Sequence, residues 1–90
     1  MKQVTFYLGE RKRVKLIISS LDNLPFIISD AKYKLKYINE VLEEGTCEID
    51  NEKREISKVL NPTQKAALTL EFEYTIMGET FVERIRLQVT

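Results

Sequence analysis

The C-terminal third of the chain alternates apolar and polar residues with a period of two. Every second residue from Leu68 to Ile76 is apolar, and the alternation resumes from Phe81 to Val89. This period is typical of β-strands that bury one face. Gly78-Glu79 lies between the two runs, and glycine suits the first central position of a type II′ turn. We therefore predict a hairpin over residues 68–89, at the centre of the fold.

The predicted turn fixes a register for this hairpin. Phe72 then faces Ile85 on the inner face, and Glu73 meets Arg84 on the outer face. A slip of one residue would move the whole apolar row to the solvent face. Glu83 falls inward in this register, where we expect a rim position from which its carboxylate reaches water or a tyrosine hydroxyl.

Shorter alternating runs precede the hairpin. Val4–Leu8 and Val14–Ile18 predict two strands, and residues 21–25 carry the chemistry of a turn. A weaker run at Arg54–Leu60 predicts a further strand that ends before Pro62, because proline cannot extend a ladder.

Residues 31–44 fit two structures. Apolar residues at 31, 35, 38 and 42 have helical spacing, with Asp30 and Gly45 as candidate caps. The same segment alternates apolar residues with the lysines at 32, 34 and 36, which is strand periodicity. A hairpin with its loop at 39–41 would place Tyr33 opposite Cys47 and the lysines opposite Glu or Thr. We favour the hairpin, with Thr46–Ile49 as its second strand, over the helix.

Composition narrows the function classes. Ninety residues make a single domain, 1–90, and 14 basic residues balance 14 acidic ones. This balance argues against a dedicated nucleic-acid or membrane binder. The chain has no histidine and one cysteine, which excludes imidazole catalysis and an internal disulfide and nearly excludes a zinc ligand set. We expect no enzyme activity, no catalytic residues, no cofactor, no metal and no small-molecule substrate.

Cellular placement follows from what the chain lacks. No apolar run reaches the length of a membrane span, and the N-terminus has no signal-peptide core. We expect a cytoplasmic protein at synthesis, or one that joins a virion assembled there. Cys47 is expected to behave as a small buried hydrophobic residue rather than as a reactive thiol.

The densest basic cluster is Arg11-Lys12-Arg13, followed closely by Lys15. Its simplest interpretation is a solvated loop beside an edge strand, where positive charge deters edge-to-edge pairing. The alternative function is nucleic-acid binding by a small β-barrel, with this cluster contacting phosphates and Tyr7 stacking on bases. The lysines at 32, 34 and 36 are expected to form the solvated face of a strand paired with glutamates.

Residues 26 to 89 carry a family pattern. An apolar piece precedes Ser29–Leu35, then Glu44–Asp50 follows, then a strand that ends in Val59–Pro62, then the alternating run and the closing strand. This pattern resembles small immunoglobulin-like proteins encoded by bacteriophages, prophages and related mobile elements. The resemblance implies an all-β, immunoglobulin-like β-sandwich of about seven antiparallel strands. It also implies a non-enzymatic structural or adaptor module that assembles with other protein subunits, including copies of itself.

Two surfaces are candidates for such assembly. One is the edge of the Val4–Leu8 strand, where Val4 and Tyr7 lie next to the basic cluster. The other is the tip of the central hairpin, with Met77 and Glu79 on either side of Gly78. Either could work by edge-strand addition or by face packing.

Overall fold

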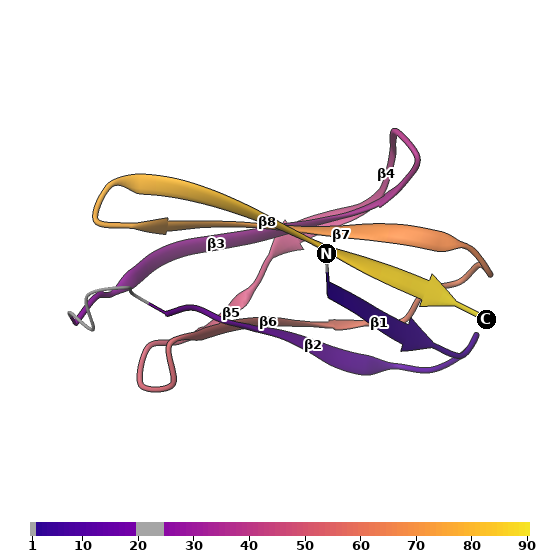
Figure 1. The fold of residues 1–90 in the computed structure, drawn as a ribbon, viewed down its shortest axis with the longest axis horizontal. Coiled ribbons are helices and arrows are strands. Elements are labelled where there is room, and N and C mark those ends of the chain that lie inside the picture. Colours follow the sequence, from indigo (N-terminus) through magenta and orange to yellow (C-terminus); the bar gives the residue numbers. More distant parts are fainter. Residues whose placement is uncertain (1, 20–24) are drawn as a thin grey trace.

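A computed structural model describes residues 2–19 and 25–90, which form eight β-strands in two facing sheets (Figure 1). The larger sheet has the order β1-β8-β7-β3-β4, and the smaller sheet has the order β2-β6-β5. The all-β prediction is confirmed, with one strand more than the seven expected. The bounds are β1 (Lys2–Phe6), β2 (Lys12–Ile17), β3 (Ile28–Tyr37), β4 (Glu40–Thr46), β5 (Glu48–Asp50), β6 (Glu55–Leu60), β7 (Ala67–Ile76) and β8 (Glu79–Val89).

A turn was predicted at residues 21–25. Residues 21–24 lie outside the described ranges, so this prediction is not tested. Along the described part of the chain, no helix is both long enough and apolar enough to cross a membrane.

The central hairpin forms as predicted, but its register differs by two residues. Its turn is Met77-Gly78, with φ values of 51° and 81°. Positive φ at both central positions is the geometry of a type I′ turn, whose twist matches that of the flanking strands. The predicted turn at Gly78-Glu79 was therefore wrong, and Phe72 faces Glu83 rather than Ile85. A shift of two residues keeps every side chain on its predicted face.

Glu83 lies at the rim of the inner face, as predicted. It is exposed, and its carboxylate accepts a hydrogen bond of 3.4 Å from the Tyr74 hydroxyl. The prediction of a rim carboxylate is confirmed.

Residues 31–44 form a hairpin, and the helical interpretation was wrong. β3 and β4 pair antiparallel around Ile38-Asn39, with an irregularity in register after Leu35. Tyr33 faces Gly45 instead of Cys47. A Cβ at position 45 would lie 3.3 Å from the Tyr33 ring, so glycine leaves the room that the ring occupies.

The chain changes sheets at Cys47, which the sequence did not indicate. Cys47 donates its backbone N–H to the Ala31 carbonyl at 3.0 Å, directly after β4 ends at Thr46. Glu48–Asp50 then pairs with β6 in the smaller sheet. The predicted single strand Thr46–Ile49 was therefore wrong, because the chain divides between the two sheets at this point.

β1 is an edge strand of the larger sheet, as the sequence predicted for Val4–Leu8. It runs parallel to β8 and ends at Phe6, so Tyr7 and Leu8 lie in the connection to β2. Val4 is half-buried and packs against the core. It is therefore less available for contacts with a partner than the sequence suggested.

The core fills the space between the sheets. Its inner rows come from both layers, and nine side chains are almost completely removed from solvent. They are Phe6, Phe72, Ile28, Ile56, Leu60, Leu68, Leu70, Leu87 and Val89.

Phe72 and Phe81 lie on neighbouring strands but differ in exposure, at 0% and 40%. We predict that Phe72→Ala lowers the free energy of unfolding by about 3–5 kcal/mol, because it opens a cavity at the centre of the core. Phe81→Ala, which removes a stacked contact with Tyr74, should cost about 1 kcal/mol. Urea unfolding of both variants tests this difference, and equal losses would contradict the described core.

The Met77-Gly78 turn gives a second prediction. Methionine is strained at positive φ, whereas asparagine tolerates it, so Met77→Asn should stabilise the protein by about 1 kcal/mol. Thermal unfolding measures the change. If the turn were Gly78-Glu79, residue 77 would lie in a strand, and asparagine there would lower the melting temperature.

Candidate functional site

The predicted interaction residues lie at opposite ends of a domain about 40 Å long. Met77 lies in the β7–β8 turn and Glu79 follows that turn at one end, whereas Tyr7 and Arg11 lie in the β1–β2 connection near the other (Figure 1). The structure does not bring them together. They define two separate candidate surfaces, as the sequence suggested.

The Lys12 side chain is engaged within the domain. Its Nζ donates to the Thr5 carbonyl at 2.6 Å, lies 3.6 Å from the Glu10 carboxylate, and sits 4.5 Å above the Phe6 ring. Glu10 also accepts the backbone N–H of Tyr7 at 2.6 Å. These contacts tie the end of β1 to the start of β2 and partly neutralise the basic cluster.

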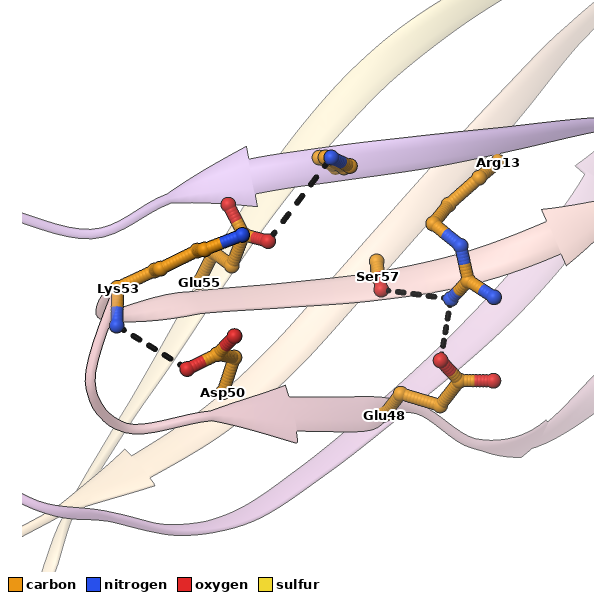
Figure 2. Close-up of polar contacts among 7 residues, drawn as sticks. Arg13, Glu48, Asp50, Lys53, Glu55 and Ser57 are labelled. Atoms are coloured by element: carbon orange, nitrogen blue, oxygen red, sulfur yellow. Dashed lines mark hydrogen bonds and ion pairs between the residues drawn. The ribbon is translucent and has the colours of Figure 1, made fainter.

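Arg13 belongs to another surface, the outer face of the smaller sheet. Its guanidinium donates to the Glu48 carboxylate and, at 3.0 Å, to the hydroxyl of the buried Ser57 (Figure 2). Next to this group, Lys15 lies 4.0 Å from Glu55. The sequence did not reveal these partners, because they follow Arg13 by 35 and 44 residues. The basic cluster is divided between two surfaces and balanced by carboxylates, which does not favour the nucleic-acid alternative.

The outer face of the larger sheet carries a row of alternating charges. Glu44, Lys34, Glu71 and Arg84 are neighbours across four strands. Glu71 is the centre of two ion pairs, with Lys36 at 3.3 Å and Arg84 at 3.1 Å. The expected pairing of the lysine face with glutamates is confirmed here.

The Glu71 carboxyl is tuned by its neighbours. Burial raises its pKa, but the hydrogen bond and charge of Lys36, together with Arg84, outweigh burial and lower the pKa below its ordinary value of 4.5. The carboxylate is therefore held in its charged form across the physiological range.

The end of the domain that carries Met77 has an exposed apolar surface. Phe26 and Ile27, just before β3, lie beside Met77 and Gly78 around a shallow apolar hollow. Ile27 is 70% exposed and Met77 is 85% exposed. We call Phe26, Ile27 and Met77 the end surface. The sequence suggested Met77 alone, because residues 26–27 are far from it in the chain.

Two residues of the β5–β6 turn hold this end in place. The Asn51 side-chain oxygen accepts the backbone N–H of Ile28 at 2.8 Å, and its amide nitrogen donates to the Ile28 carbonyl at 3.3 Å. Arg54 lies 4.8 Å above the Phe26 ring. The sequence showed only a polar turn at 50–53, and neither contact could be inferred from it. The end surface is therefore anchored across both sheets.

Within residues 2–19 and 25–90, no group of three or more acidic or cysteine side chains could hold a metal ion. Cys47 is half-buried, and burial raises its pKa to about 11. Its thiol is therefore protonated at neutral pH, which fits a small packing residue. Burial also raises the pKa of the Tyr33 hydroxyl, which donates to Glu43 at 2.7 Å.

No protein-family model matches the sequence, and no curated protein shows detectable similarity to it. The resemblance to phage-encoded immunoglobulin-like proteins stays a prediction from the residues that carry it.

The pKa of Glu71 leads to a test of the charged face. Because its pKa is lower in the folded protein, its contribution to stability is present above about pH 4.5 and is lost as the pH falls through the folded value. Glu71→Gln should lower the urea midpoint at neutral pH. We expect the difference from the unaltered protein to shrink in acid, where both side chains are neutral.

Glu73→Gln is the matched control, because Glu73 is exposed on the same strand and face. It should change the midpoint less at every pH. A Glu71→Gln deficit of constant size from neutral pH to acid would show that the lost contact is not electrostatic.

Proposed function

We propose that this protein is an immunoglobulin-like module that mediates protein–protein assembly, as a structural subunit or an adaptor. The end surface carries this proposal. Exposed Ile27 and Met77, with half-buried Phe26 beside them, form an apolar surface at one end of the sandwich, and exposed apolar patches on folded domains mark contact sites. Phe26 and Ile27 directly precede β3, which Asn51 ties to the smaller sheet, and Met77 lies in the two-residue β7–β8 turn, so the end surface suits a preformed docking site.

The strand arrangement supports the immunoglobulin-like part of the proposal. In immunoglobulin domains the sheet containing the last two strands faces a sheet built from the first, second, fourth and fifth strands of the basic plan. Here β8 and β7 lie in one sheet with β3 and β4, and β2, β6 and β5 form the other. β1 differs from the basic plan, because it pairs parallel with β8 at one edge of the larger sheet instead of joining the smaller sheet. The tryptophan and disulfide of antibody domains are absent from the sequence.

The position of the end surface agrees with this plan. In antibody variable domains, binding loops include the connection between the second and third strands and the last hairpin, at one end of the sandwich. The same two connections supply Phe26, Ile27 and Met77 here. By analogy, this end of the domain would contact a partner.

A phage or prophage origin completes the proposal. It rests on the sequence pattern of residues 26–89, and it makes the partner another protein of a phage-encoded assembly. A nucleic-acid role has less support, because Lys12 and Arg13 are engaged by different carboxylates on different surfaces.

Mutation of the end surface tests the proposal. We predict that Ile27→Lys with Met77→Lys weakens association by at least about tenfold, since lysines would bring charge into an apolar contact. Light scattering behind size exclusion over a range of concentrations measures self-association. Affinity capture from the source cell, with the partner identified and its yield compared between variants, measures association with other proteins.

Tyr7→Lys is the control, because Tyr7 is 67% exposed at the opposite end of the domain. This variant should leave association intact. Circular dichroism should show that both variants keep the fold of the unaltered protein. If Tyr7→Lys abolishes association and the end-surface variant does not, the contact lies at the β1 end. If no variant changes any association, the proposed role of the end surface is wrong.

A further inference from the structure

We propose that β4 accepts an extended, basic segment of a partner protein as an added strand of the larger sheet. This inference rests on the proposed assembly function and names the chemistry of one partner. It concerns a surface that is separate from the end surface.

β4 is an open edge. All seven of its residues are exposed, and β3 is its only strand partner in the described ranges. Figure 1 shows the tip of the β3–β4 hairpin pointing away from the smaller sheet. An exposed edge strand presents unpaired backbone donors and acceptors to an incoming strand.

The other edges of the two sheets are less suited to this role. At the end of β1, Lys12 occupies the Thr5 carbonyl and Glu10 occupies the Tyr7 N–H. β5 has only three residues. β2 carries three basic side chains, Lys12, Arg13 and Lys15, so its charge is opposite to that of β4. β4 is the longest of the four edge strands of the described chain.

Charge indicates what kind of segment fits. β4 contains Glu40, Glu43 and Glu44 and no basic residue. On the outer face, the alternating row from Arg84 through Glu71 and Lys34 ends with Glu44 at the edge. A strand added beside β4 would extend this row, and a lysine or arginine opposite Glu44 would continue the alternation.

The same charges argue against a second copy of β4 as the occupant. Two β4 strands side by side would bring six carboxylates together, and like charges on adjacent strands destabilise the pair. The acidic edge therefore deters pairing with itself while it favours a basic segment. Backbone hydrogen bonds would supply affinity, and the glutamates would supply selectivity.

A model peptide tests the inference with the full chain. The probe is an eight-residue peptide of alternating lysine and valine, titrated into ¹⁵N-labelled protein. We expect saturable shifts of the backbone amides of residues 40–46, and weaker binding at higher salt. An alternating glutamate–valine peptide should not bind. A lysine–valine peptide methylated at every backbone nitrogen should also fail, because it keeps its charges but cannot donate to β4.

Two charge-reversal variants complete the experiment. Glu40→Lys with Glu44→Lys should weaken peptide binding by at least about tenfold. Glu52→Lys with Glu79→Lys, at the other end of the domain, changes net charge equally and should bind as the unaltered protein does. Glu40 and Glu44 are both exposed, whereas Glu43, which accepts a hydrogen bond from Tyr33, is left unchanged. The amide spectrum reports whether each variant is folded.

Three results would overturn the inference: no binding, shifts centred outside residues 40–46, or equal binding of the methylated peptide. The last would show charge attraction without strand addition. The end-surface variant Ile27→Lys with Met77→Lys should bind the peptide normally. If the peptide does not bind at β4, the further inference is wrong, and the proposed assembly function is still tested separately by the end-surface measurements.

Discussion

β7 lies between β8 and β3, and burial of its inner row holds both sheets together. Leu70 faces Ile85 on one side and Leu35 on the other, and it is fully removed from solvent. Each such residue contributes roughly 1.5–3 kcal/mol, a large share of the stability of a 90-residue domain. Because three strands share this row, β7 fixes the register of the larger sheet and the surface on which the smaller sheet packs.

Alternation along the sequence identified most of the strands, but not the division of Thr46–Ile49 between β4 and β5. It gave the central hairpin, the β3–β4 hairpin and the rim position of Glu83, because a period of two is imposed by burial of one face. It could not fix the register within two residues, because such a shift keeps the faces unchanged. The turn decided the register, and Met77 was missed as a turn residue because methionine seldom adopts positive φ.

Contacts between distant segments account for what the sequence could not show. The change of sheet at Cys47 depends on the space between the layers, and no local signal marks it. The Asn51 clamp on Ile28 and the pairing of Arg13 with Glu48 join residues far apart in the chain. Only part of the end surface could be predicted, for the same reason. Met77 was expected at the exposed tip of the hairpin, whereas Phe26 and Ile27 lie beside it only in the folded protein.

On the outer faces of both sheets, charged side chains form ion pairs with one another. Two surfaces differ from these faces. One is the apolar end surface, and the other is the acidic edge of β4. Hydrogen exchange with mass spectrometry, on the chain alone and in its native assembly, tests directly whether such surfaces carry its function. The account predicts added protection in residues 25–29 and 75–79, with residues 40–46 protected when a basic strand is bound. Protection confined to the sheet faces or to residues 2–13 would contradict it.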